Sequence, residues 1–125
     1  MNNRPRPVVL YVDDEEMNLT LFQITFQDQF RVITSNDPIK GLDVVDENGA
    51  DLDVVVSDMR MPGMDGIEFI TKVREKFPDL SCFILTGFAA NEKVISALED
   101  KLIINSFSKP FDTDTIQQAV LDTLR

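Results

Sequence analysis

The sequence of 125 residues predicts an α/β fold in which helices cover both faces of a doubly wound, five-stranded parallel sheet. Two observations predict it. Five short apolar runs, mostly rich in β-branched side chains, recur along the chain, and segments with helical spacing of apolar residues alternate with them. Strands that alternate with helices form a parallel sheet, because each crossover helix returns the chain to the same edge. The predicted strands are residues 8–12, 30–34, 54–56, 82–85 and 103–107.

Five helices are predicted, each from a stripe of apolar residues. The second begins at Asp37, a good N-cap residue followed by Pro38 at the first helical position; the third ends before Pro78, and the fifth begins at Asp112. The stripes are Leu19, Phe22 and Phe26; Ile39, Leu42 and Val45; Ile67, Ile70, Val73 and Phe77; Val94, Ala97 and Leu98; and Ile116, Ala119, Val120 and Leu124.

The composition of the strands predicts their order. The first, third and fourth runs are almost wholly apolar, as expected for strands that are buried on both faces. Arg31 in the second run, and Asn105 and Ser106 in the fifth, indicate edge strands. Right-handed crossovers then favour the order 2-1-3-4-5. We expect one domain over residues 1–125, with residues 1–6 as a disordered lead-in.

The composition excludes several classes of function. With no histidine and one cysteine, Cys82, the chain has no Ser-His-Asp machinery, no Cys-rich zinc site and no internal disulfide. A net charge of −10 argues against direct binding of nucleic acid. No apolar run approaches the ~20 residues that span a bilayer, and the first run leads into four acidic residues rather than a signal-peptide cleavage site, so we expect a cytoplasmic protein.

Ligands of an open parallel sheet bind beyond the carboxyl ends of its strands, where the strand order reverses. Asp13 and Asp14 follow the first strand and Asp58 follows the third, so three carboxylates are expected at this switch point. They would repel one another without a cation, and oxygen ligands alone favour Mg²⁺. With Lys109 and Thr86 at the ends of the neighbouring strands, the site is suited to a phosphoryl group and to a carboxylate nucleophile.

Four segments, residues 12–15, 57–66, 85–87 and 109–111, follow one another on the expected elements. With them, the sequence resembles the receiver domain of bacterial two-component response regulators, over essentially all 125 residues. The resemblance implies a flavodoxin-like fold and a phosphorylation-dependent switch in signal transduction. It also implies that the surface of the fourth helix, fifth strand and fifth helix changes on phosphorylation, and in this family that surface commonly forms homodimers.

The resemblance also assigns roles to residues. Asp58 is the implied phosphoacceptor. The implied donor of its phosphoryl group is a sensor histidine kinase or a histidine-phosphotransfer protein. Asp13 and Asp14 are implied to hold Mg²⁺ together with Asp58 and the backbone carbonyl of Arg60. Thr86 and Lys109 are implied to bind the phosphoryl oxygens, and the peptide bond between Lys109 and Pro110 is typically cis in the family. The cognate kinase and the downstream effector are not specified by the residues.

Three positions are unusual for the family or are expected to affect the lifetime of the aspartyl phosphate. Most receivers have Tyr or Phe three residues before the lysine, where this chain has Ser106, and strand alternation places the adjacent Phe107 on the opposite face. We therefore expect no aromatic switch of the usual kind, and a signal that passes through the loop after Thr86 or the fourth helix. Arg60 and Phe88 each lie two residues beyond a key site residue and are expected to shield an aspartyl phosphate from water.

Two other classes of function remain open from the sequence. One is a receiver-like adaptor that binds partners without being phosphorylated. Ser106 leaves this function open, although the intact set of Asp13, Asp14, Asp58, Thr86 and Lys109 argues against it. The other is a Mg²⁺-dependent phosphatase with an aspartyl nucleophile. The run from Asp112 to Thr115 faintly resembles the DxDxT motif of such phosphatases, but it opens a helix, so N-capping explains it better. In the receiver interpretation the chain is no enzyme beyond its own phosphorylation and dephosphorylation.

Overall fold

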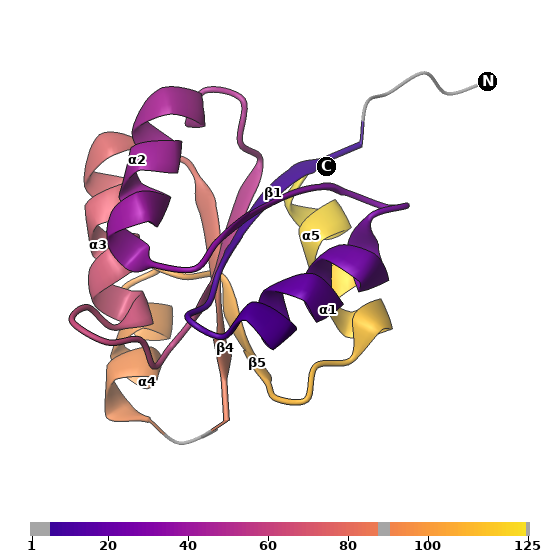
Figure 1. Cartoon of the computed structure of the whole chain (residues 1–125). Helices are drawn as coiled ribbons and strands as arrows, with labels where there is room; N and C mark the ends of the chain where they lie inside the picture. The colour runs from indigo at the N-terminus through magenta and orange to yellow at the C-terminus, as the bar shows by residue number, and fades with distance from the viewer. Residues whose placement is uncertain (1–5, 88–90, 125) are drawn as a thin grey trace.

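The computed structural model describes residues 6–87 and 91–124 and contains a single sheet of five parallel strands in the order β2-β1-β3-β4-β5 (Figure 1). The predicted fold class and strand order are therefore confirmed. The strands are β1 (Val8–Val12), β2 (Arg31–Ser35), β3 (Val54–Asp58), β4 (Ser81–Thr86) and β5 (Asn105–Ser108).

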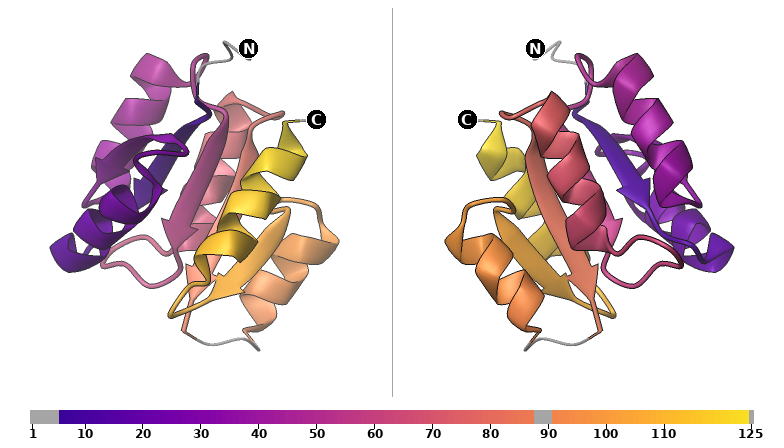
Figure 2. Two further views of the ribbon diagram at one scale, coloured as in Figure 1. Left: turned by 90° about the vertical axis from the view of Figure 1, so that its right-hand side faces the viewer. Right: turned by 90° about the vertical axis from the view of Figure 1, so that its left-hand side faces the viewer.

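Five helices alternate with the strands and cover both faces of the sheet. The helices α2, α3 and α4 pack on one face, and α1 and α5 pack on the other (Figure 2). Within the described part of the chain, no helix is long and apolar enough to cross a membrane. The helices are α1 (Glu16–Phe26), α2 (Pro38–Asn48), α3 (Gly66–Lys76), α4 (Glu92–Glu99) and α5 (Thr113–Thr123).

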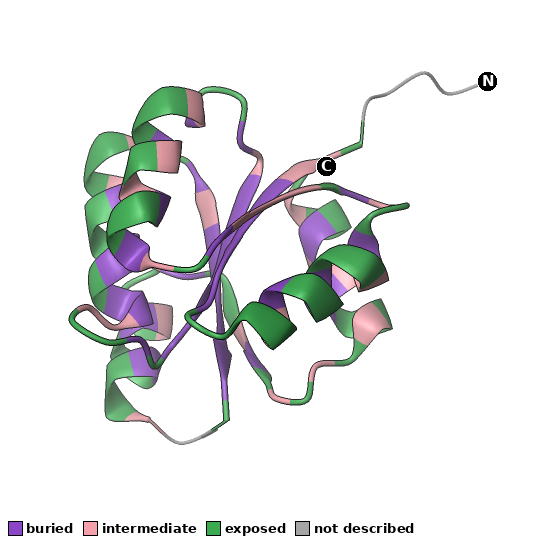
Figure 3. Cartoon of the chain, in the orientation of Figure 1, coloured by how far each residue is buried: buried purple, intermediate pink, exposed green. Residues whose placement is uncertain are grey.

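The burial of the strands agrees with the predicted centre and edges of the sheet. Every residue of β3 is buried, whereas β2 and β5 carry exposed or half-buried residues (Figure 3). The side of α1 and α5 holds an aromatic cluster in which Phe22 stacks on Tyr11 and contacts Phe26 and Phe111. The other side is built mainly from aliphatic residues of the strands, α2, α3 and α4. These two layers hold the carboxyl ends of β1, β3 and β4 at one rim.

Most predicted strand ends differ from the observed ones by one or two residues, and two strands, β2 and β5, begin later than predicted. In both of these an apolar residue is buried without belonging to the ladder. Phe30 is fully buried, but its N–H bonds the carbonyl of Phe26 at the end of α1, so β2 begins only at Arg31. Ile103 is nearly fully buried, yet β5 begins at Asn105, opposite Phe83. An apolar run indicates burial, and it does not indicate where the inter-strand hydrogen bonds begin.

The predicted helix starts are confirmed by their caps. The Asp37 carboxylate accepts hydrogen bonds from the N–H groups of Ile39 at 2.7 Å and Lys40 at 3.1 Å, with Pro38 as the first residue of α2. The Asp112 carboxylate accepts from the N–H of Asp114 at the start of α5, as expected for an N-cap rather than for part of a phosphatase motif.

Lys101 ends α4 in a backbone conformation that favours glycine. Its φ is 59°, and the N–H groups of Lys101 and Leu102 bond the carbonyls of Leu98 and Ala97 in a Schellman motif. We expect Lys101→Gly to raise the free energy of unfolding by about 0.5–1 kcal/mol, because it relieves the strain of a side chain in the left-handed region. Urea unfolding measures this. Lys72→Gly, within α3, is the matched control and should lower stability by about 1 kcal/mol; a loss of stability in both variants would contradict the prediction.

Candidate functional site

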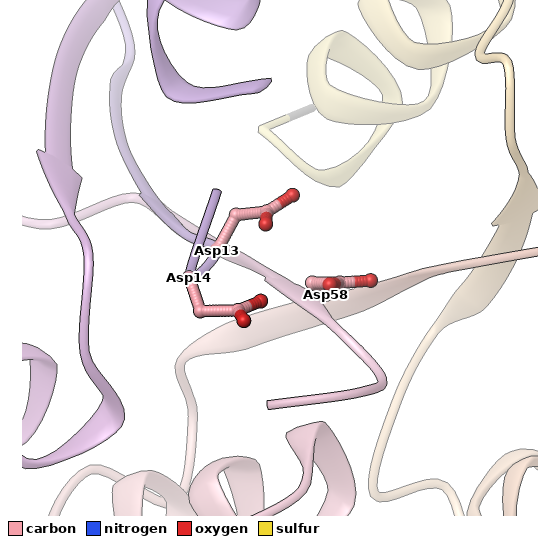
Figure 4. Close-up of side chains that lie close together, drawn as sticks. All are labelled: Asp13, Asp14 and Asp58. Atoms are coloured by element: carbon pink, nitrogen blue, oxygen red, sulfur yellow. The ribbon is translucent and has the colours of Figure 1, made fainter. Parts of the chain in front are cut away.

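The acidic residues predicted at the switch point lie together. Asp13 and Asp14 follow β1, and Asp58 is the last residue of the adjacent strand β3. One carboxylate oxygen from each of the three lies within 4.8 Å of the others (Figure 4). Asp13 and Asp58 are buried and Asp14 is exposed, so the cluster opens to solvent on the side of Asp14. The prediction that these three residues converge is confirmed.

Asp13 is held by a dense set of donors. It is fully buried, and its Oδ1 accepts a hydrogen bond from the N–H of Glu15 at 3.0 Å. Its Oδ2 accepts from the Tyr11 hydroxyl at 2.6 Å, from Asn18 Nδ2 at 3.1 Å and from Lys109 Nζ at 3.4 Å. Capping of α1 does not explain why Asp13 is buried with so many donors. The N-cap residue of α1 is Glu15, and its side chain makes no cap hydrogen bond.

Lys109 joins the last strand to the acidic cluster. Its Nζ lies 2.8 Å from Asp58 Oδ1 and 3.4 Å from Asp13 Oδ2. Its backbone N–H donates to the carbonyl of Thr86 at 2.9 Å, which ties the end of β5 to the end of β4. The peptide bond between Lys109 and Pro110 is cis, as expected. The cation predicted from the sequence therefore contacts two of the three carboxylates directly.

The electrostatics of the cluster follow from burial. Burial raises the pKa of Asp58, with the neighbouring charge of Asp13 acting in the same direction and Lys109 opposing it. For Lys109, partial burial alone would lower the pKa, but the hydrogen bond and charge of Asp58, followed by those of Asp13, raise it above its ordinary value. Lys109 therefore remains charged, while negative charge on Asp58 is costly unless cations face it.

The residues present fit a small, hard cation. Three carboxylates within 4.8 Å of one another, one of them open to solvent, provide the all-oxygen donor set that Mg²⁺ prefers. The loop after β3 is closed by a hydrogen bond of 2.8 Å from the Gly66 N–H to the Met59 carbonyl, and Arg60 is the next residue of that loop. Arg60 also lines a hollow of about 460 Å³ between this loop and the start of α4.

The other predicted site residues differ in how closely they approach the cluster. Thr86, the last residue of β4, is buried next to the Lys109 backbone. Ser106 is half-buried opposite Ile84, whereas Phe107 is buried on the other face, where it stacks on Phe83 at 5.3 Å. The expected separation of Ser106 and Phe107 onto opposite faces is thus observed. Phe88 lies outside the described residues.

Three residues at the site were missed in the sequence. Tyr11 and Asn18 both bond Asp13, and Gly66 lies directly behind Asp58. A signal for Tyr11 existed, because residues two apart on a strand share a face and Tyr11 precedes Asp13 by two. Asn18 comes from the first turn of α1, whose orientation over the strand end the sequence does not specify. The close approach of Gly66 to Asp58 likewise depends on how α3 packs.

A family model described as "Response regulator receiver domain" matches residues 9–121 of the chain. The chain belongs to the response regulator receiver domain family. This confirms the resemblance seen in the sequence, and the cluster of Asp13, Asp14 and Asp58 corresponds to the acidic pocket of receiver domains. Receiver domains belong to two-component signalling systems and partner with histidine kinases or phosphotransferases.

Relatives and solved structures agree with this assignment. The hydrogenase transcriptional regulatory protein HoxA of Cupriavidus necator is 32% identical over 118 residues, which cover 90% of this chain and 24% of HoxA. Sporulation initiation phosphotransferase F of Bacillus subtilis is 28% identical, over 90% of this chain and 89% of its own length. The chain thus spans about a quarter of HoxA but nearly all of the phosphotransferase.

Among solved structures, the response regulator receiver domain protein from Clostridium thermocellum superposes with a TM-score of 0.88 at 25% identity, over 94% of this chain and 93% of that one. The chemotaxis protein CheY4 of Vibrio cholerae gives a TM-score of 0.84 at 27% identity, over 94% of this chain and 98% of that one. The receiver domain is therefore similar to other members of its family along almost its whole length.

Proposed function

We propose that this receiver domain is a phosphorylation-dependent switch that accepts a phosphoryl group on Asp58 in a Mg²⁺-dependent reaction. The observation that carries the proposal is the position of Asp58, beside two further carboxylates and with Lys109 Nζ 2.8 Å from its Oδ1. Asp13, Asp14, Asp58 and the backbone carbonyl of Arg60 are the proposed Mg²⁺ ligands. Mg²⁺, when bound, offsets the negative charge of the incoming phosphoryl oxygens.

The transfer step is a nucleophilic displacement at phosphorus. A carboxylate oxygen of Asp58 forms the new O–P bond while the P–N bond of the donor phosphohistidine breaks, and the imidazole nitrogen keeps the electron pair and takes a proton. Because these 125 residues include no histidine, the donor lies outside them, on a sensor histidine kinase or a histidine-phosphotransfer protein. Lys109 and the Thr86 hydroxyl would then bind the phosphoryl oxygens, in place of the direct bond between Lys109 and Asp58.

The donor protein is proposed to dock on α1. This helix exposes Met17, Leu21 and Ile24, which are 83%, 54% and 61% exposed. Leu21 also lines a hollow of about 540 Å³ that reaches Lys109 and Phe111, so the apolar surface borders the acidic cluster. A phosphohistidine must come within bonding distance of Asp58, and an apolar surface beside the site can hold the protein that carries it.

We propose that phosphorylation changes the surface formed by α4, β5 and α5 and that the protein acts in the cytoplasm. The downstream effector is unknown, and homodimerisation through this surface is one form that the response can take. Thr86 is the last residue of β4 and α4 is the next helix along the chain, so movement of its hydroxyl toward a phosphoryl group would be passed to α4 through the chain. Ser106 provides no aromatic ring to follow this movement. We therefore propose that the signal passes through the loop after Thr86, of which residues 88–90 lie outside the described residues, or through α4.

Incubation with Mg²⁺ and acetyl phosphate, followed by intact-mass measurement and a phosphate-release assay, distinguishes the candidate functions. The switch predicts one phosphoryl group per chain and little turnover. An adaptor that binds partners without phosphorylation would give no adduct, and a Mg²⁺-dependent phosphatase would release phosphate over many turnovers. Either of these results would contradict the proposed function.

Arg60 and Phe88 are proposed to slow hydrolysis of the aspartyl phosphate. Arg60 is exposed on the loop two residues beyond Asp58, and its long cationic side chain can limit the approach of water. We expect Arg60→Ala, and likewise Phe88→Ala, to shorten the lifetime of the phosphoryl group about tenfold, the lower end of the range for substitutions of residues that surround a metal site. Loss of the adduct is followed by intact mass after removal of the donor. Unchanged lifetimes in both variants would contradict this assignment, and Arg31→Ala on β2 is the control.

A further inference from the structure

Tyr11 presents a fixed hydrogen-bond donor to the acidic cluster. Its ring is 1% exposed and stacks on Phe22, with centroids 4.2 Å apart. Its hydroxyl donates to Asp13 Oδ2 at 2.6 Å, the shortest of the four hydrogen bonds that the Asp13 carboxylate accepts from the described residues. A phenol has an ordinary pKa of about 10 and is therefore a hydrogen-bond donor at neutral pH.

The hydrogen bonds of Asp13 Oδ2 explain where Lys109 lies. A carboxylate oxygen has about two lone-pair sites. On Oδ2, the two shortest bonds come from the Tyr11 hydroxyl at 2.6 Å and from Asn18 Nδ2 at 3.1 Å. The Lys109 ammonium is the third and most distant donor at 3.4 Å, and it lies instead 2.8 Å from Asp58 Oδ1. The two buried carboxylates compete for one cation, and Asp13 is already satisfied.

We propose that Tyr11 is a positioning residue that satisfies Asp13 and thereby keeps Lys109 on Asp58. Without the hydroxyl, a lone pair of a fully buried carboxylate loses its closest donor, and the nearest group able to replace it is Lys109. The ammonium then shifts toward Asp13 and away from the oxygen atoms of Asp58. Only the consequence for phosphorylation rests on the proposed function; the position of Lys109 does not.

The first test uses metal-free protein and requires no phosphorylation. The NMR signal of the Lys109 Cε methylene group, assigned by its loss in Lys109→Ala, reports the contacts of the ammonium. Tyr11→Phe keeps the ring and removes the hydroxyl, so we expect the signal to move toward its position in Asp58→Asn, in which the pair with Asp58 is weakened. Asn18→Ala removes the other close donor and should move the signal in the same direction. Phe22→Leu, which changes the ring stack and retains the hydroxyl, should leave it in place.

The second test measures phosphorylation by acetyl phosphate and Mg²⁺. We expect Tyr11→Phe to slow it about tenfold, the lower end of the range for a residue that supports a metal ligand, and Phe22→Leu, which retains the hydroxyl, to slow it less than Tyr11→Phe does. An unmoved Lys109 signal in both Tyr11→Phe and Asn18→Ala would overturn the inference. Absence of phosphorylation in the unsubstituted protein would overturn the proposed function instead, and the NMR result would still decide the role of Tyr11.

Discussion

Replacing Lys109 with alanine is expected to lower the free energy of unfolding of the metal-free protein by about 2–3 kcal/mol. Removal of one partner from a buried ion pair typically costs about 3–5 kcal/mol, and the partial exposure of Lys109 places the effect below that range. Its Nζ contacts Asp58 and Asp13, so the substitution leaves two buried carboxylates without their shared cation. Urea unfolding in the presence of a chelator measures the loss.

Mg²⁺ should reverse much of this loss, because a second cation replaces the missing one. A ligand that binds only the folded state adds about 2.7 kcal/mol at one hundred times its Kd. We therefore expect a larger Mg²⁺-dependent gain in Lys109→Ala than in the unsubstituted protein. Lys76→Ala is the matched control, since Lys76 pairs with Asp46 on the surface and both side chains are nearly half exposed. If the two variants lost equal stability, or if Mg²⁺ had no effect on either, the proposed charge balance would be wrong.

Gly66→Ala is expected to lower stability by about 1–3 kcal/mol and to slow phosphorylation of Asp58. A Cβ at this position would lie 2.4 Å from the Asp58 carbonyl oxygen and 2.8 Å from Ile84 Cδ1. Backbone cannot yield as a flexible side chain does, so the added methyl group displaces either α3 or the backbone of the proposed phosphoacceptor. Unfolding and the rate of adduct formation with acetyl phosphate measure the two effects.

Gly63→Ala separates the two effects. Gly63 lies in the loop between β3 and α3, with φ at 83°. Among the described residues, its chain neighbours apart, no heavy atom lies within 4 Å of the point that a Cβ would occupy. Alanine there is strained but displaces nothing. We expect it to cost about 1 kcal/mol in stability while the phosphorylation rate stays close to that of the unsubstituted protein. Equal slowing in both variants would show that loss of stability, and not displacement of Asp58, reduces the rate.

The architecture could be predicted from the sequence because each layer has its own pattern. The apolar β3, flanked by turn residues, indicated a central strand, and Asp37 with Pro38 indicated where α2 begins. The start of β5 could not be predicted, because Ile103 is buried by packing against the side of α2, α3 and α4 and not by ladder pairing. Local patterns give the identity of an element more reliably than its first residue.

The sequence predicted those residues of the site that lie at the carboxyl ends of strands. Asp13 and Lys109 directly follow β1 and β5, and Asp58 ends β3, so the rule that ligands bind at the carboxyl ends of the strands brings these residues together. Which donors surround them depends on how α1 and α3 approach the rim, and this hid the contributions of Asn18 and Gly66. Tyr11 was hidden for another reason: within an apolar run a tyrosine has the pattern of an ordinary core residue, although its buried hydroxyl requires a partner.

The most direct test of the central claim is the location of the phosphoryl group. After reaction with acetyl phosphate and Mg²⁺, borohydride reduction of the acyl phosphate and peptide mass mapping identify the modified residue. We predict that the label lies on Asp58, that it is absent without Mg²⁺, and that Asp58→Asn abolishes it. A label on Asp13 or Asp14, or one that persists in Asp58→Asn, would contradict the assignment of Asp58 as the phosphoacceptor.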